Sequence, residues 1–386
     1  MNPELPTPEP YSPEPKKRGF KAKLESFKHW ASNNKKKLYF YSALGVVVIV
    51  GAGLWAMMYF WNGPSALNFP KTEPVKEEQK FYSPLTGVEV PDEVTSKKIV
   101  TAIMLENSPD ARPQSGLKDA GICFEAIAEG GITRFACLYQ ETRPGLIGPV
   151  RSLRPYYLDW VAGFDPAIAH IGGSASALNE VRNGSYKDID QFFNPGAYWR
   201  AADRYAPHNV YTNFDRLDAL NANKGFTTSN FVAFTRKPLI KTPKDVANND
   251  AVNAKLPNAN SIDVQMSGGT YNSTYQYDPT KKEYARSQGG GPHMDREGGL
   301  ITPEVVIVMK VNMFRGFEDG YREQITTLGS GPAYIFQEGR VIEGDWHKSE
   351  KRGLLKFTDK NGNVIALTRG QTWIAAIPNE KSVTWQ

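Results

Sequence analysis

The 386-residue chain has little of the material from which metal centres and redox sites are built. It contains two cysteines, Cys123 and Cys137, and five histidines. The cysteines do not have the spacing of a zinc site, and neither stands where a lipid-modified N-terminal cysteine would. Three histidines, His170, His208 and His293, fall in turn regions but lie far apart in the sequence. We therefore expect no metal ion.

The sequence also lacks the short motifs of nucleotide-binding and hydrolase sites. It has no Gly-Lys-Ser/Thr phosphate loop and no dinucleotide-binding fingerprint. The stretch "GGSAS" around Ser174 is not the Gly-x-Ser-x-Gly elbow of a serine hydrolase. We expect no cofactor, and no serine nucleophile at Ser174 or Ser152.

Most of the chain carries no net charge. Residues 1–37 hold nine Lys or Arg and four Glu, which accounts for the whole net charge of +5. The other 349 residues are neutral, with 37 basic and 37 acidic side chains. A neutral body lacks the electrostatic footprint of a nucleic-acid-binding protein, so we expect no nucleic-acid partner.

Residues 38–61, "LYFYSALGVVVIVGAGLWAMMYFW", form a long apolar run without a charged residue. About 20 apolar residues cross a bilayer, and aromatic residues stand at both ends of this run. The lysines precede it, so the positive-inside rule places residues 1–37 in the cytoplasm and residues 62–386 outside. A cleaved signal peptide fits poorly, because both the basic region and the apolar run are too long. The alternative is a buried core helix; we expect a single-pass protein of the cell membrane.

The cytoplasmic tail has two parts, a Pro-rich start and the segment "FKAKLESFKHWA". The second places Phe20, Leu24, Phe27 and Ala31 on one helical face among lysines. This pattern suits a helix on anionic inner-leaflet lipids. A disordered positive-inside tail is an equally good interpretation.

Outside the membrane, the sequence predicts an α+β fold in two domains after a linker at residues 62–80. Strand and helix patterns alternate over residues 81–240, which indicates a mixed α/β domain. A polar, Pro- and Asn-rich stretch follows. Residues 255–386 then read almost entirely as strands separated by Gly and Asn, which indicates a β-rich domain.

The stretch "EGGITRFACLY", residues 129–139, predicts the second half of a β-hairpin. If residues 129–131 form a three-residue loop, Cys123 lies opposite Cys137. Outside the cytoplasm such a pair can oxidise to a disulfide. The alternative is two small buried apolar side chains.

Glu129, at the tip of this hairpin, is the best candidate for a catalytic acid. Glu125 lies four residues earlier on the same strand face, about 13 Å away, which is too far for the paired carboxylates of a glycosidase. A single-acid mechanism of the lytic-transglycosylase type stays open. So does a solvated turn acid or a salt bridge to an arginine.

Other polar residues gather at turns and suggest an anion-binding cleft. Arginine side chains bind carboxylates and phosphates with two parallel hydrogen bonds, and a helix start such as that after Ser174 attracts anions. The alternative is internal ion pairing with Asp159, Asp165 or Asp203. The candidate binding residues are Arg134, Arg151, Arg154, His170, Ser174, Arg204, His208, His293 and Asp295.

Several short segments occur in a telling order: "SPLTG", "NSPDARPQSGL", "EGGITRF", "GPVRSLR", "HIGGS", "APHNVYT", "GGGPHMD" and "GSGPAYIFQEGRVIEGDWHK". As an ordered set over residues 81–386, they resemble the YerB-type bacterial lipoprotein family, a two-domain family of unknown biochemical function. The resemblance implies a protein on the outer face of the cytoplasmic membrane, and it implies no catalytic residue. Lipoproteins of that family are tethered by a lipidated cysteine, which this N-terminus lacks.

Three functions remain open from the sequence. The first is binding of an anionic envelope component, either peptidoglycan or a protein of its synthesis machinery. The second is glycan cleavage with Glu129 as the acid. The third is a protein-interaction scaffold in the cell envelope.

Overall fold

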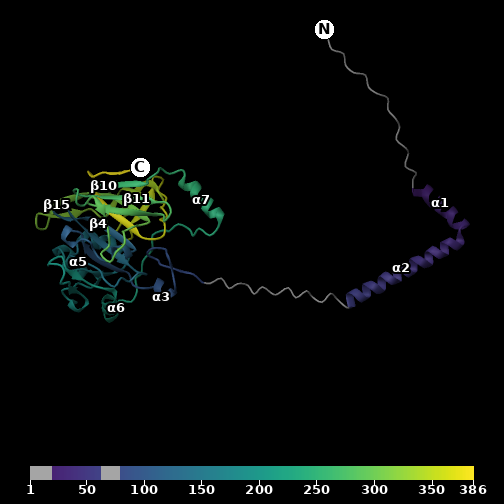
Figure 1. Cartoon of the computed structure of the whole chain (residues 1–386), viewed down its shortest axis with the longest axis horizontal. Helices are drawn as coiled ribbons and strands as arrows, with labels where there is room; N and C mark the ends of the chain where they lie inside the picture. Colours follow the sequence, from purple (N-terminus) through teal and green to yellow (C-terminus); the bar gives the residue numbers. More distant parts are fainter. Residues whose placement is uncertain (1–19, 62–78) are drawn as a thin grey trace, which may run out of the picture. The chain divides into compact units, whose positions relative to one another are not determined.

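The computed structural model describes residues 20–61 and 79–386 (Figure 1). The chain forms two compact units, Met1–Glu78 and Gln79–Gln386, each described here by itself. The Pro-rich start of the tail and most of the predicted linker lie outside the described residues.

The first unit contains two helices, α1 (Phe20–Asn33) and α2 (Lys35–Trp61). α2 has 27 residues, its most apolar 18-residue stretch has a mean hydropathy of 2.1, and none of its residues is buried within the described unit. It is the one helix among the described residues that is long and apolar enough to cross a membrane. It covers the predicted span of residues 38–61 and begins three residues earlier, at the lysines.

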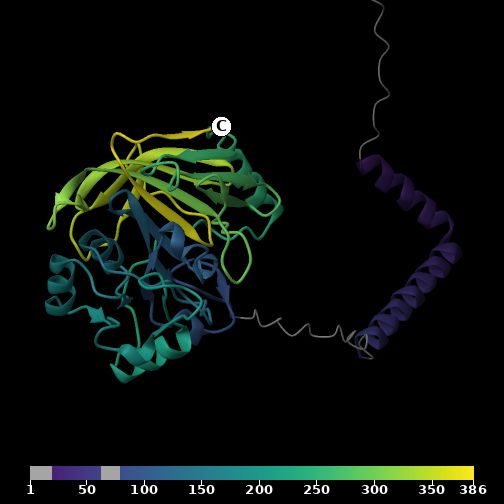
Figure 2. The ribbon, with the colours of Figure 1, turned by 60° about the vertical axis from the view of Figure 1, so that its left-hand side comes forward.

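The second unit, Gln79–Gln386, is a mixed α+β structure (Figure 2). Its α-helices are α3 (Glu93–Ser96), α4 (Pro155–Ala162), α5 (Ala175–Asn183), α6 (Phe214–Asn223) and α7 (Pro243–Asn253). Its 3₁₀ helices are η1 (Pro109–Ala111), η2 (Leu117–Asp119) and η3 (Pro195–Ala197). Among the described residues, those after α7 form strands and loops only.

The strands of the first half are short except for three. They are β1 (Phe81–Tyr82), β2 (Glu89–Val90), β3 (Thr101–Glu106), β4 (Ile122–Glu129), β5 (Ile132–Tyr139), β6 (Ala167–Ala169), β7 (Lys187–Asp188), β8 (Trp199–Arg200) and β9 (Val210–Tyr211). The second half adds β10 (Ser261–Val264), β11 (Ser273–Asp278), β12 (Glu283–Gln288), β13 (Gly291–Pro292), β14 (Val305–Val311), β15 (Met313–Phe317), β16 (Arg322–Ile325), β17 (Gly329–Gln337), β18 (Arg340–Lys348), β19 (Lys356–Asp359), β20 (Thr372–Pro378) and β21 (Val383–Trp385). The predicted α+β fold, mixed first and β-rich second, is confirmed.

A twelve-stranded sheet runs through the unit in the order β19-β18-β17-β14-β20-β4-β5-β3-β6-β7, with the β15–β16 hairpin attached to β4. β20, near the C-terminus, lies parallel between β14 and β4. A five-stranded sheet, β13-β12-β11-β10-β21, packs nearby. The central sheet therefore includes strands from both sides of the polar stretch that predicted a domain boundary.

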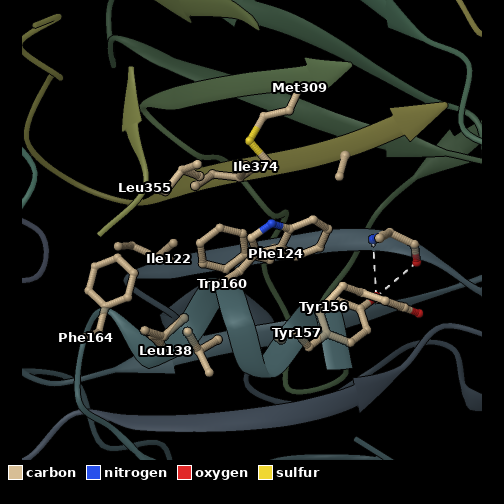
Figure 3. Packing of buried hydrophobic residues seen from close by; sticks show 14 of the residues in the cluster. Ile122, Phe124, Leu138, Tyr156, Tyr157, Trp160, Phe164, Met309, Leu355 and Ile374 are labelled. Atoms are coloured by element: carbon tan, nitrogen blue, oxygen red, sulfur yellow. Dashed lines mark hydrogen bonds between the residues drawn. The ribbon is translucent and has the colours of Figure 1, made fainter. Parts of the chain in front are cut away.

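The two faces of the central sheet carry separate cores, because side chains alternate along each strand. Phe124 and Ala126 of β4 face a cluster that includes α4, where the ring of Trp160 stacks on Phe124 at 5.8 Å between centroids. Figure 3 shows this cluster, with Trp160 against Phe124 and strand residues above them. Cys123 belongs to the other cluster, which faces the five-stranded sheet.

The β4–β5 hairpin departs from the expected loop. Its turn is the two glycines Gly130 and Gly131, both with positive φ, and Ala128 forms a β-bulge before it. Cys123 still pairs with Cys137, and the structure joins them in a disulfide. The bulge shifts the alternation by one residue, so Glu129 and Glu125 face opposite sides of the sheet. The prediction that they share a face was wrong.

Candidate functional site

Glu129 holds two arginines on the α4 side of the sheet. Its Oε1 accepts a hydrogen bond from Arg134 Nη2 at 2.7 Å, and its Oε2 accepts one from Arg154 Nη2 at 2.5 Å. Both guanidinium groups are almost fully buried, while the Glu129 side chain is 20% exposed. Arg134 Nη1 also donates to the carbonyl of Ser152. The hairpin tip is thereby fixed to the "RSLR" segment that directly precedes α4.

This arrangement determines the charge state of Glu129. Burial alone would raise the pKa of its carboxyl, but Arg134 and Arg154 outweigh burial and lower that pKa to about 2. Glu129 is therefore a carboxylate at neutral pH. A general acid must carry a proton, so the geometry favours the ion-pair interpretation of this residue.

A second carboxylate, Glu106 at the end of β3, lies nearby and is buried. Its Oε1 accepts hydrogen bonds from Ser108 Oγ and from His208 Nδ1, both at 2.8 Å, and lies 3.3 Å from Arg151 Nε. Ser108 Oγ is also 3.2 Å from the same nitrogen, His208 Nδ1. A catalytic triad requires the serine and the acid to contact opposite ring nitrogens, so this group is not one.

The cluster carries more positive than negative charge. Burial lowers the pKa of Arg151. The positive charges of Arg134 and Arg200 lower this pKa further, and the carboxylates of Glu106 and Glu129 raise it. With Arg154 included, four guanidinium groups face two carboxylates, which leaves an excess of two positive charges. We call these six residues the arginine cluster. Three of its members reach solvent: Arg151 and Glu129 are about one-fifth exposed, and Arg200 is more open.

The rim beside Arg151 and Arg200 is partly aromatic and partly polar. Phe192 and Tyr205 are exposed, by 66% and 91%. Phe192 lies against Gly172, whose carbonyl accepts a hydrogen bond from the backbone of Leu153 in the "RSLR" segment. One exposed carboxylate, Asp110, lies 3.9 Å from His208 Nε2. The rim therefore offers apolar surface next to the positive charge.

His170 and Ser174 have structural contacts in the loop that follows β6. His170 is fully buried between the Gly172 carbonyl and Asp188. Ser174 caps α5 by accepting a hydrogen bond from Ala177 N. The anion expected at this helix start is supplied by the chain itself, because Glu318 accepts hydrogen bonds from the first backbone N–H groups of α5.

The other candidate residues divide between the two sides of the sheet. Arg204 donates to the carbonyls of Asp110 and Pro113 and so fixes a loop beside His208. His293 and Asp295 lie apart from the arginine cluster, in the second half, and Asp295 accepts backbone hydrogen bonds in a turn. Within residues 20–61 and 79–386, no three metal-binding side chains converge.

The sequence analysis did not name two important carboxylates, Glu106 and Glu125, as site residues. Glu106 ends a strand that otherwise reads as apolar, and a charged residue at that position was an available signal. Glu125 is fully buried in β4 and pairs with Arg286 at 2.8 Å. Its partner is 161 residues away, so no local pattern indicates the pair.

Fold and site together define an α+β protein with one apolar N-terminal helix and a buried ionic cluster across its central sheet. Two family profiles match it, "Protein of unknown function (DUF3048) N-terminal domain" at residues 85–227 and the corresponding C-terminal domain at residues 262–374. A curated relative, "Putative lipoprotein YerB" of Bacillus subtilis, is 33% identical over 307 residues, which cover 78% of this chain and 87% of the relative. The chain therefore belongs to the YerB-like family.

A solved structure extends the similarity to three dimensions. The crystal structure of YerB from Bacillus subtilis matches with a TM-score of 0.69 and 29% sequence identity. The match covers 79% of this chain and all of the solved chain. The relative's name describes a lipoprotein and assigns neither a ligand nor a reaction.

Proposed function

We propose that this protein is a single-pass protein of the cell membrane, with its N-terminus in the cytoplasm and residues 79–386 outside. The length and apolar composition of α2, and the lysines that precede it, support this topology. The similarity to a protein named as a putative lipoprotein also supports a position outside the cytoplasm for residues 79–386. In this proposal α2 replaces the lipid as the anchor.

The proposal extends to α1, which we assign to the inner membrane surface. Leu24, Phe27 and Trp30 are exposed by 45%, 56% and 41%, and the rings of Phe27 and Trp30 stack on each other. Lys21 and Lys28 belong to the same helix, and three further lysines begin α2. Exposed apolar rings among lysines suit the boundary of an anionic leaflet.

The outer unit, in this proposal, binds an anionic component of the cell envelope at the arginine cluster, either peptidoglycan or a protein of its synthesis machinery. The observation that carries it is the excess of two positive charges around Arg151, which is open to solvent. An anion at Arg151 and Arg200 would neutralise that excess with charge-assisted hydrogen bonds. Phe192, which lies against Gly172, supplies apolar contact beside it.

The test is co-sedimentation of the full-length protein, in detergent, with isolated peptidoglycan. We expect binding that weakens with added salt and falls at least tenfold in Arg151→Gln. Arg315→Gln, an exposed arginine of β15, is the matched control and should bind like the wild type. Equal binding by both variants, or none by the wild type, would contradict the glycan ligand; crosslinking to envelope proteins in membranes then tests the scaffold alternative.

The same assay tests glycan cleavage. Soluble muropeptide release by the wild type, lost in a folded Glu129→Gln variant, would establish an enzyme. We expect no release, since Glu129 is ionised and held by two arginines.

A further inference from the structure

A hollow of about 340 Å³ opens where the two halves of the outer unit meet. Its volume is at the lower end of the range of small-ligand pockets. Two segments that carry the family resemblance form its walls, "NSPDARPQSGL" and "GGGPHMD". The lining residues are Arg112, Pro113, Gln288, Pro292, His293 and Met294.

Behind the hollow lies a fully buried polar network that joins the two halves. Glu125 Oε2 accepts hydrogen bonds from Arg286 Nη2 at 2.8 Å and from Trp373 Nε1 at 3.0 Å. Its Oε1 accepts from Thr133 Oγ1 at 3.1 Å. The guanidinium of Arg286 also lies over the Trp373 ring, 4.4 Å from its centroid. These contacts fix the floor of the hollow.

His293 is part of that floor and has no free ring nitrogen. Its Nδ1 is hydrogen-bonded to Arg286 Nη1, and its Nε2 lies 3.1 Å from Gln114 Oε1. Burial lowers the pKa of His293 well below its usual value, and the charges of Arg286 and Arg112 lower it further. His293 is therefore neutral, with Nε2–H donating to Gln114, and it contributes a ring surface to the hollow.

Gln288 supplies an unused acceptor. Its side chain is 92% buried, and its Nε2 lies 3.4 Å from Glu125 Oε1. Since a carboxylate accepts only, this contact identifies the nitrogen of the amide and so the oxygen. Gln288 Oε1 is buried and has no hydrogen-bond partner anywhere in the described part of the chain. An unpaired buried carbonyl oxygen is unfavourable by roughly 1–3 kcal/mol and calls for a donor.

Arg112 supplies unused donors on the facing wall. Three of its N–H groups donate to the Asn107 side chain, the Asn107 carbonyl and the Thr270 carbonyl. A guanidinium group has five N–H donors, so two of those of Arg112 donate to no acceptor within residues 20–61 and 79–386. The group also lies over the ring of Tyr271, 5.2 Å from its centroid.

We propose that this hollow binds the N-acetyl group of an amino sugar. The amide N–H of the ligand donates to Gln288 Oε1, and its carbonyl accepts from a free N–H of Arg112. The acetyl methyl lies against Pro113, Pro292 and Met294.

The edge of the neighbouring sheet favours a sugar over a peptide. A peptide would bind most simply by adding a strand to an edge, through alternating backbone hydrogen bonds. The edge strand here, β13, has two residues, and Pro292 has no N–H to donate. The hollow therefore recognises one compact group rather than an extended backbone.

The experiment is a titration of the full-length protein in detergent with the trimer of N-acetylglucosamine, which is uncharged and so is not attracted to the arginine cluster. We expect saturable binding that the de-acetylated glucosamine trimer does not show. Met294→Arg places a long side chain at the exposed rim and should weaken binding at least tenfold. Val364→Arg, another exposed apolar residue in a distant loop, is the control and should change nothing.

A second variant, Gln288→Met, removes the acceptor at nearly constant volume and should abolish binding of the N-acetylglucosamine trimer. A cooperative urea unfolding transition shows that this variant is folded. Absence of binding by the wild type, or equal binding of both trimers, overturns the proposal. Preference for an N-acetylated dipeptide over the sugar would identify a peptide site instead and also overturns it. Binding of the trimer and co-sedimentation with peptidoglycan are measured separately, so failure here is distinguishable from failure of the anion site.

Discussion

At the residue scale, the buried charges of residues 79–386 are stabilised in groups. Glu129 is shared by two buried arginines, and Glu125 by an arginine, an indole and a hydroxyl. Removing one partner of such a group leaves an unpaired buried charge, which typically destabilises a protein by about 3–5 kcal/mol. These residues are therefore sensitive probes of folding as well as of function.

The depressed pKa of Glu129 predicts a dependence of stability on pH. Its pKa falls from 4.5 to about 2 on folding, so its contribution is complete above pH 4.5 and is lost as the pH falls from there towards 2. A shift of this size corresponds to about 3 kcal/mol. Urea unfolding of wild type and Glu129→Gln between pH 7 and 2.5 measures it. The difference in free energy of unfolding between the two proteins should shrink as the pH falls from 4.5 towards 2.5. A difference that stays constant would contradict the ion pairs of Glu129.

The cysteine pair gives a second prediction at this scale. The disulfide closes a separation of 14 residues, and a loop of about this length corresponds to roughly 3 kcal/mol of unfolded-state entropy. We expect the Cys123→Ala/Cys137→Ala double variant to unfold at lower urea concentration by an amount up to that value. A reducing agent should destabilise the wild type and leave the double variant unchanged. Insensitivity of the wild type to reduction during unfolding would show that the bond is not formed.

At the element scale, the bulge at Ala128 decides what Glu129 does. Without it, strict alternation would turn Glu129 towards the Glu125 side of the sheet and away from Arg134 and Arg154. Deletion of Ala128 brings Glu129 directly after Ile127, so regular alternation keeps it opposite Ile132 on the α4 side. We therefore expect this variant to keep the contacts of Glu129 with Arg134 and Arg154 and to retain binding of anionic polymer. Insertion of one glycine between Gly130 and Gly131 changes the turn but leaves the strand alternation intact. Loss of binding in the deletion variant would contradict this account of the register.

The β4–β5 hairpin shows which features of the fold can be predicted from the sequence. The hairpin, the opposition of Cys123 and Cys137, and the apolar span of α2 follow from local periodicity and turn residues, and all were predicted. The bulge was not, because "AIAEGG" fits a regular strand with a longer turn equally well. Arg134, Arg151 and Arg154 were named as candidates from charge at turns. The partner of Arg151, Glu106, was not named, because their contact depends on tertiary packing.

At the scale of the whole molecule, the two halves of the outer unit share one sheet. β20 pairs with β4 across the halves, and the Glu125–Arg286 pair is buried between them. We therefore expect residues 79–386 to unfold in a single cooperative transition, although families of this kind are divided into two domains. Far-UV circular dichroism and tryptophan fluorescence should give coincident urea curves. Two separated transitions would show that the halves are independent.

The position of β20 also governs the order in which the protein can be completed during synthesis. β4 begins at residue 122, but the neighbour that lies along it begins at residue 372, roughly 250 residues later. At about 5–20 residues per second, the ribosome needs on the order of 10–50 s to make that stretch. Until then this edge of β4 has a neighbour only at Glu129, where β16 pairs with it. An open edge of this kind is where chains aggregate. The central sheet is therefore unfinished until synthesis is nearly complete, and β20, the second-to-last strand, is the one that closes it.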